Sequence, residues 1–294
     1  MKLLFLLILS VFSFQSLIAQ PAELTIVYTN NTNGNLENCV WPSHPYGALE
    51  KRATVIDSLR AVEKNLLLID TGDIFGAGLN PRRHKYIAKA YQYLNYDIWT
   101  PGDQDFIEGK NLFFESLLPA FKNTLNTNLL VEGNPFGEPF VIKESNGIKI
   151  GFTSTITKEV EDHISPIRKL DVSIEDQNKK LAPVLKELTE KSDIIVLLSH
   201  SGYDTDVEFA KSFGDIDLII GGHSQTLLKE PAFINNTYIV QAGKAGYRVG
   251  VLKLKIENSK IKSVENKLIL LDKKIKNHPE IMKIIDEYKN RVKY

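Results

Sequence analysis

Five short apolar runs constrain the fold of this chain more than any other feature of its sequence. They are residues 24–29 (LTIVYT), 65–70 (NLLLID), 96–100 (YDIWT), 193–200 (DIIVLLSH) and 217–223 (DLIIGGH). Each run is nearly continuous rather than alternating, which is typical of strands covered on both faces. Stretches with helical spacing lie between them, among them 47–64 and 173–192. Strands that alternate with helices predict an α/β fold in which much of the sheet is parallel.

Local signals refine this expectation. Ser173 is placed to cap a helix over 173–192, and Pro183 is expected to kink or interrupt that helix. Asn146-Gly147 predicts a hairpin turn within 140–155. Residues 237–272 predict a run of antiparallel strands, and 277–294 predict a charged amphipathic helix at the end of the chain.

The first twenty residues, MKLLFLLILSVFSFQSLIAQ, combine one lysine, a long apolar run and the small residue Ala19. This pattern is that of a secretory signal, and it is too short to make a good membrane span. We therefore expect a signal peptide at 1–19 and a single domain at 20–294. The mature protein is expected to be periplasmic or secreted, with no membrane anchor after the signal is removed.

Charge and cysteine content limit the partners. Lysine plus arginine and aspartate plus glutamate each number 36, so nothing in the charge balance favours nucleic acid as a partner. Cys39 is the only cysteine, which excludes an internal disulfide. An unpaired cysteine in an oxidising compartment can pair with a partner, react, or be a small buried side chain.

Polar residues follow each apolar run at the point where the expected strand ends. They are Asn31 and Asn33, then Asp73, then Asp103, Gln104 and Asp105, then His200, and finally His223 and Gln225. In open α/β sheets, ligands bind beyond the carboxyl ends of the strands. Two imidazoles and two carboxylates at one rim make a ligand set for a divalent metal, with Mn, Fe and Zn not distinguished. The alternatives are structural histidines and ordinary turn aspartates.

Six blocks of sequence, in order, carry a family resemblance. They are TNNTNGNLE, GALEKRATVIDSLR, LLLIDTGDIF, TPGDQDF, LLSHSGYDTDVEFAK and IDLIIGGHSQTLL. Over about residues 24–257 the chain resembles the metallophosphatase domain of periplasmic 5'-nucleotidases and UDP-sugar hydrolases, which are calcineurin-like phosphoesterases. The resemblance implies a two-layer β-sandwich flanked by helices, with two metal ions bridged by an aspartate and a hydroxide. It also implies hydrolysis of a small phosphate ester.

The resemblance assigns roles to positions of this sequence. Asp73 matches the bridging aspartate, His200 and His223 match metal-binding histidines, and Gln225 matches the ligand position after them. Asn31 and Asn33 stand where the family has a metal-binding aspartate and histidine. Asp103 stands at a metal-binding asparagine, and Gln104 and Asp105 stand at the catalytic His-Glu pair.

These exchanges affect the two metal positions unequally. Asp73, Asp103, His200 and His223 are a complete ligand set for one ion, whereas the other position keeps only Asp73 and Gln225. We therefore expect one well-held divalent ion and a degenerate second site. Gln104 does not titrate near neutral pH, so it cannot replace the catalytic histidine of the family.

Three functions remain open at this point. The first is a secreted phosphoesterase with altered chemistry, and the second is an inactive pseudoenzyme that binds metal, phosphate or a partner. The third is a different reaction, such as redox chemistry with Fe or Mn. The family usually carries a C-terminal nucleotide-binding domain, which we expect this chain to lack; a separate substrate-binding partner chain could supply it.

Overall fold

The computed structural model describes residues 22–38, 45–158 and 172–290. The expected signal peptide at 1–19 and Cys39 lie outside the described residues, and so do the last four residues of the expected C-terminal helix. The signal peptide and the role of Cys39 therefore stay predictions.

The first sheet has five strands in the order β14 (Lys260–Leu270), β13 (Arg248–Glu257), β1 (Ala22–Thr29), β2 (Leu66–Asp70) and β3 (Ile98–Trp99). β1, β2 and β3 run parallel to one another, while β13 pairs antiparallel with both β1 and β14. The parallel strands place their carboxyl ends at one edge of this sheet.

The second sheet has six strands in the order β11 (Ala232–Ile234), β12 (Thr237–Val240), β10 (Leu218–Gly221), β9 (Ile194–His200), β7 (Ile148–Ile156) and β6 (Phe140–Ser145). Its four central strands are parallel, and β6 and β11 pair antiparallel at the two edges. A small antiparallel sheet joins β4 (Leu129–Val131) to β5 (Asn134–Pro135) and β8 (Val172–Ile174).

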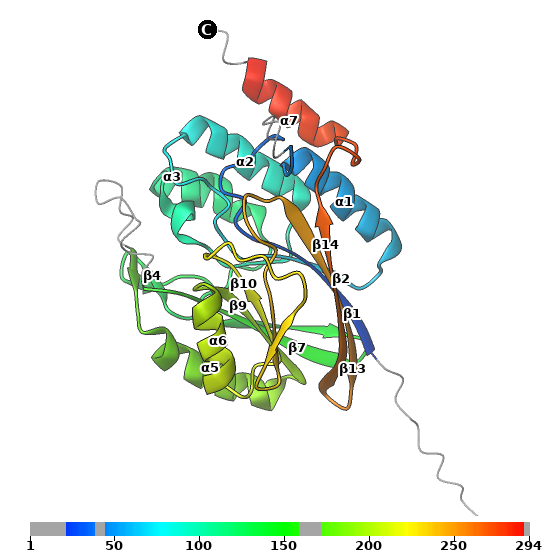
Figure 1. The fold of residues 1–294 in the computed structure, drawn as a ribbon. Helices are drawn as coiled ribbons and strands as arrows, with labels where there is room; N and C mark the ends of the chain where they lie inside the picture. The colour runs from blue at the N-terminus through cyan, green and yellow to red at the C-terminus, as the bar shows by residue number, and fades with distance from the viewer. Residues whose placement is uncertain (1–21, 39–44, 159–171, 291–294) are drawn as a thin grey trace, which may run out of the picture.

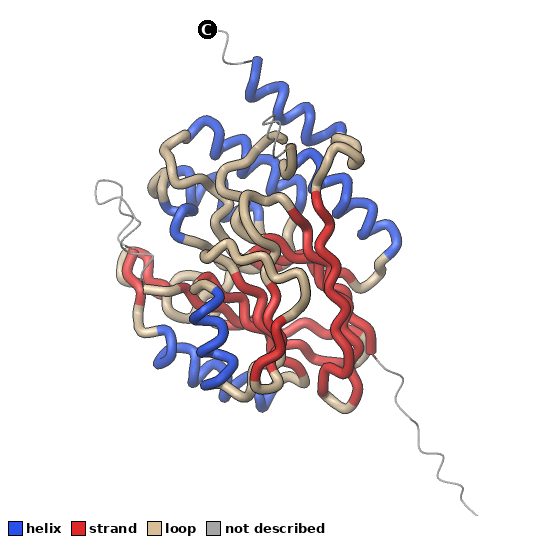
Figure 2. Tube along the Cα trace, in the orientation of Figure 1, coloured by secondary structure: helices blue, strands red, loops and turns tan. Residues whose placement is uncertain are grey.

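The helices cover the outer faces of the two large sheets, as Figures 1 and 2 show. On the first sheet lie α1 (Leu49–Val62), α2 (Pro81–Leu94) and α7 (Pro279–Asn290). On the second lie α5 (Gln177–Lys191) and α6 (Tyr203–Ser212). Short helical turns follow β3: η1 (Asp103–Phe106), α3 (Lys110–Leu112), η2 (Phe113–Leu117) and η3 (Leu118–Ala120).

Alternation along each strand explains these layers. Ile26 and Tyr28 of β1 are buried in the core between the sheets, together with Val196 and Leu198 of β9. Val27 points the other way, into the core under α1 and α2. Because successive side chains of a strand point to opposite faces, a fully apolar strand needs cover on both sides. The predicted two-layer sandwich flanked by helices is confirmed.

The structure also corrects three local predictions. Ser173 belongs to β8, and the side chain of Asp176 caps α5 instead by accepting a hydrogen bond from the backbone of Lys179 at 2.9 Å. α5 is continuous across Pro183, so the proline does not interrupt the helix; a kink at Pro183 stays a prediction. The expected antiparallel run within 237–272 is split, because β12 pairs in the second sheet while β13 and β14 pair in the first.

Two other local predictions are confirmed. Residues 145 and 148 flank the turn between the antiparallel strands β6 and β7, as the Asn146-Gly147 pair predicts. α7 forms where the amphipathic pattern predicts it and buries Ile281 and Ile285. Within the described ranges, every helix is too short or too polar to cross a bilayer.

Candidate metal centre

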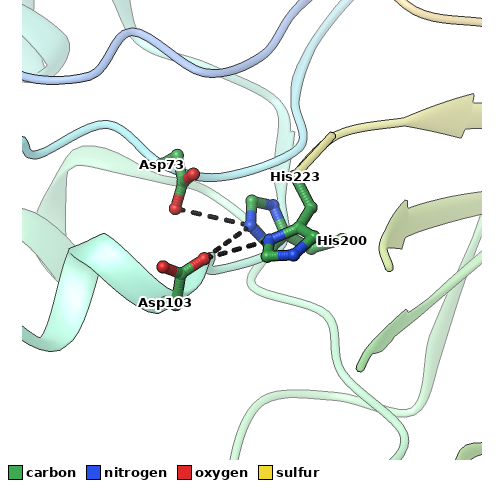
Figure 3. Close-up of side chains that lie close together, drawn as sticks. All are labelled: Asp73, Asp103, His200 and His223. Atoms are coloured by element: carbon green, nitrogen blue, oxygen red, sulfur yellow. Dashed lines mark hydrogen bonds and ion pairs between the residues drawn. The ribbon is translucent and has the colours of Figure 1, made fainter. Parts of the chain in front are cut away.

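Four of the predicted ligands meet at the rim where the carboxyl ends of the strands converge (Figure 3). Asp73 follows β2, Asp103 opens η1 after β3, His200 ends β9, and His223 follows β10. Each offers one ligand atom, and these atoms all lie within 4.8 Å of one another. The parallel strands of both sheets therefore bring together residues that lie far apart in the sequence.

Short contacts join the four side chains. Oδ1 of Asp103 lies 3.2 Å from Nε2 of His200 and 3.2 Å from Nδ1 of His223. Oδ1 of Asp73 lies 3.4 Å from the same Nε2 of His200. Two carboxylates and two imidazoles converging in this way are the donor set that a divalent transition metal takes in proteins. The residues present therefore fit the metal that the resemblance implies.

The loops that carry these residues have unusual backbone geometry. The backbone of Asp73 has φ 57°, that of His223 has φ 65° and that of Gln225 has φ 56°. Non-glycine residues in this left-handed region are uncommon and gather at functional sites. Gly102 permits a close approach, since a Cβ on it would lie 2.4 Å from Oδ1 of Asp73.

The ring of His200 is oriented by the backbone. Its Nδ1 donates to the carbonyl oxygen of Thr71 at 2.6 Å, which leaves Nε2 facing the two aspartates. A ligating histidine usually donates its second ring nitrogen to a carbonyl or carboxylate in this way. Thr71 was not singled out from the sequence; its place two residues before Asp73 is the only signal for it.

The neighbouring charges of the cluster shift the pKa values of Asp103 and His200. Burial alone would raise the pKa of Asp103, but hydrogen bonds and charge from His200 and His223 hold it well below its usual range. Burial alone would lower the pKa of His200, but the neighbouring charges of Asp73 and Asp103 raise it well above its usual value. Both shifts follow from the close approach of two carboxylates to two imidazoles.

Two neutral amides contact the other oxygen of Asp73. Nδ2 of Asn31 donates to Oδ2 of Asp73 at 3.1 Å, and Nε2 of Gln104 donates to the same oxygen at 2.9 Å. The orientation of Asn31 is set by Asn30, whose Nδ2 donates to Oδ1 of Asn31 at 2.7 Å. Sequence reasoning missed Asn30, although the density of amides in TNNTNGN was the available signal. The buried Oδ1 of Asn33 has no hydrogen-bond partner among the described residues.

Asp105 hydrogen-bonds to backbone groups of the loops that carry the cluster. Its carboxylate is fully buried and accepts hydrogen bonds from the backbone N–H groups of Gly102, Asp73, Ile74 and Phe75 at 2.8–3.1 Å. Burial, with the charge of Asp73, raises the pKa of Asp105 to about 8, while the backbone donors oppose the shift. These contacts make Asp105 a residue that holds the Asp73 loop against η1.

A pocket opens beside the cluster, and Gln104 and Gln225 are among the residues that line it. Its lining comprises Asp73, Ala77, Asp103, Gln104, Ile107, His223 and Gln225. Gln225 therefore lies beside the cluster, and its role as a ligand stays a prediction. Ala77 and Ile107 form an apolar part of the wall that sequence reasoning did not identify.

The fold and the cluster define a class: an α/β sandwich with a metal-ligand set at the carboxyl ends of its strands. Residues 43–226 match the family model of the calcineurin-like phosphoesterases, which is more than half of the chain of 294 residues. The chain therefore belongs to the calcineurin-like phosphoesterase family, as the motif blocks predicted.

Individual relatives agree with this assignment. A 5'-nucleotidase from Diplobatis ommata is 27% identical over 308 residues, covering 92% of this chain and 52% of the relative. The chain thus spans about half the length of this curated relative.

Solved structures share the fold. A 5'-nucleotidase precursor from Thermus thermophilus has a TM-score of 0.80 at 23% identity, with 92% of this chain and 59% of that chain covered. The calcineurin-like phosphoesterase YfkN from Bacillus subtilis has a TM-score of 0.76 at 19% identity, with 92% of this chain and 98% of that chain covered. At these identities the likeness supports the fold alone.

Proposed function

We propose that this protein is a secreted or periplasmic phosphoesterase that works with one firmly held divalent ion. The observation that carries the proposal is the set of four donor atoms, from Asp73, Asp103, His200 and His223, that lie within 4.8 Å of one another. Membership of the calcineurin-like phosphoesterase family supports the reaction class.

The contacts of Asp73 support a single ion rather than two. Its Oδ1 faces the histidine cluster, while its Oδ2 accepts hydrogen bonds from Asn31 and Gln104. An oxygen that bridges two ions must offer a lone pair toward the second ion, and here two amide donors engage that oxygen. An amide oxygen is also a weaker ligand for a transition metal than the carboxylate or imidazole it replaces.

The chain's own residues would share the work as follows. A bound divalent ion supplies Lewis-acid chemistry, polarising a phosphoryl oxygen and activating water. The amides of Gln104 and Gln225 line the pocket and can donate to phosphoryl oxygens. Because neither amide titrates, neither can protonate a leaving group. The site therefore suits esters whose leaving group departs as a stable anion, such as aryl phosphates.

Substrate recognition beyond the phosphoryl group is proposed to come from elsewhere. The chain covers 52% of the Diplobatis ommata 5'-nucleotidase, so a nucleoside-binding region need not be shared with it. A small phosphate ester remains the proposed ligand, and a separate substrate-binding chain is the proposed partner.

A second candidate function is a non-catalytic metal- or phosphate-binding module. The observation that favours it is the engagement of Gln104 with Asp73 at 2.9 Å, which places a non-titrating group where a catalytic acid or base is needed. Restoring the family's residues separates the two candidates. A pseudoenzyme gains hydrolysis in the variant Asn31→Asp, Asn33→His, Gln104→His, whereas equal activity in both forms contradicts that function.

Metal analysis tests the main proposal. Mature protein is exposed to Mn, Fe or Zn, freed of loosely bound ions and measured by elemental analysis. We expect about one ion per chain, lost in Asp73→Ala and in His223→Ala but retained in Asp204→Ala, an exposed residue of α6. Two ions per chain would contradict the single-ion proposal, and no ion would contradict the metal site.

A further inference from the structure

We propose that the cleft selects phosphodiesters, which are monoanions, over phosphate monoesters, which are dianions near pH 8. This inference rests on the proposed function and names the substrate class of the same site. It follows from the charges that face the pocket and from the shape of the pocket wall.

Among the described residues, the pocket is lined by two carboxylates and one imidazole and by no lysine or arginine. Its lining side chains are Asp73, Ala77, Asp103, Gln104, Ile107, His223 and Gln225. Lys244 lies on a loop that contacts the Asn31 segment through the backbone of Gly246, but it is not part of this lining. Apart from the imidazole of His223, which belongs to the metal-ligand set, these side chains present negative charge and neutral amides to a ligand.

One bound divalent ion would only neutralise the negative charges of Asp73 and Asp103. Its charge of about +2 cancels the charges of Asp73 and Asp103, so a bound dianion would add two uncompensated negative charges where a monoanion adds one. Buried charges without partners are disfavoured, and each further negative charge in such a cleft weakens binding.

Asn31 and Gln104 are the residues that create this preference. Both donate to Oδ2 of Asp73, at 3.1 and 2.9 Å. These two neutral donors satisfy the hydrogen-bonding capacity of Oδ2 of Asp73. A second cation bound at the same oxygen would instead add positive charge to the site. Asn31 is completely buried, and the hydrogen bond from Asn30 fixes the direction of its amide. The Asn31 amide is therefore held with its NH₂ group toward Asp73.

The apolar wall gives the second ester group a place to lie. A diester carries an additional carbon substituent that a monoester lacks, and burying it needs apolar contact. Ala77 and Ile107, which line the pocket together with Gln104, supply that contact.

Binding of two stable analogues tests the inference without requiring turnover. Phenylphosphonate at pH 8 is the dianion, and its monomethyl ester is the monoanion of similar shape. Both are titrated calorimetrically into protein loaded with Mn, and the bound metal is counted in the same samples. We expect one ion per chain and at least about tenfold tighter binding of the monoanion, which is the size of effect that one buried charge commonly produces. Hydrolysis of bis(p-nitrophenyl) phosphate and p-nitrophenyl phosphate gives a second readout with the same expected order.

The triple variant Asn31→Asp, Asn33→His, Gln104→His is expected to bind two ions and to reverse the preference. The matched control places the same residue types at remote exposed positions, Asn134→Asp, Asn290→His and Gln92→His, and is expected to behave as wild type. If the triple variant does not fold, the single variant Gln104→His is expected to reduce the preference by at least about threefold.

The outcomes separate the two proposals. One bound ion with equal or tighter binding of the dianion overturns the diester preference and leaves the single-ion phosphoesterase standing. One bound ion with no binding of either analogue also overturns the preference. The absence of bound metal overturns both proposals.

Discussion

Arg52 and Asp70 are opposite charges in the core, joined through the hydroxyl group of Tyr91. Nη1 of Arg52 donates to Oη of Tyr91 at 2.6 Å, and that hydroxyl donates to Oδ2 of Asp70 at 3.2 Å. Both charged residues are fully buried. The pair connects the loop after β1 with the loop after β2. Arg52 also donates to Oγ1 of Thr32 at 2.8 Å, and Asp70 accepts a hydrogen bond from the backbone N–H of Gly72 at 2.9 Å.

Arg52→Met is expected to lower the free energy of unfolding by about 3–5 kcal/mol, since it leaves the Asp70 carboxylate buried without a cation. Urea denaturation followed by circular dichroism measures this change. Arg60→Met removes a partly exposed arginine that pairs with Asp57 at 3.8 Å and should cost less than about 1 kcal/mol. A similar loss for both variants would contradict the role assigned to the buried pair.

Asp105→Asn is expected to destabilise the fold by about 1–3 kcal/mol, because its amide NH₂ group would face two backbone N–H donors that now have an acceptor. The shift of the Asp73 loop should also weaken metal binding by about tenfold or more. Thermal denaturation and metal titration of the same variant measure the two effects. Asp215→Asn, at an exposed position, serves as the control, and unchanged metal affinity in Asp105→Asn would contradict the positioning role.

Gly102→Ala is expected to weaken metal binding by at least about tenfold. Its new Cβ would lie 2.4 Å from Oδ1 of Asp73 and 2.5 Å from Cε1 of His200, so at least one ligand must move. Gly78→Ala is the matched control, since a Cβ there meets no atom within 4 Å. Competition titration against a metal chelator compares the two variants, and equal affinities would show that the loop accommodates the extra methyl group.

Asp206→Asn is expected to flatten the dependence of stability on pH. Burial raises the pKa of Asp206 to about 8, although Ser199 and His200 oppose the shift. In the unfolded chain an aspartate has a pKa of about 4. Between about pH 4 and 8 the folded state therefore keeps a proton that the unfolded state has lost. Stability falls as pH rises through this range, by up to about 1.4 kcal/mol per pH unit.

Denaturation midpoints of wild type and Asp206→Asn between pH 4 and 9 measure this contribution. The difference in stability between the two proteins should change with pH up to about pH 8 and then stay constant. Asp204→Asn, in the same turn of α6 but exposed, should follow wild type throughout. Parallel curves for wild type and Asp206→Asn would exclude Asp206 as the source of the dependence.

The most continuously apolar strands could be predicted from sequence. β1, β2 and β9 are continuous apolar runs, and their composition alone indicates burial on both faces. The prediction failed where two neighbouring elements belong to different sheets. β12 and β13 follow each other closely, yet β12 pairs with β10 and β11, whereas β13 pairs with β1 and β14. Pairing partners are set by long-range contacts that a local pattern does not contain.

The sequence alone also determines which chemical groups stand at the strand ends. Asp73, Asp103, His200 and His223 could be identified as a ligand set because parallel strands share one edge, and the amides at 31, 33 and 104 are visible by inspection.

The direction of each side chain depends on tertiary structure. Asp105 turns to four backbone N–H groups, and Asn31 and Gln104 turn to the same oxygen of Asp73. The reason is physical: a polar side chain follows the donors and acceptors around it, and here residues distant in sequence supply them.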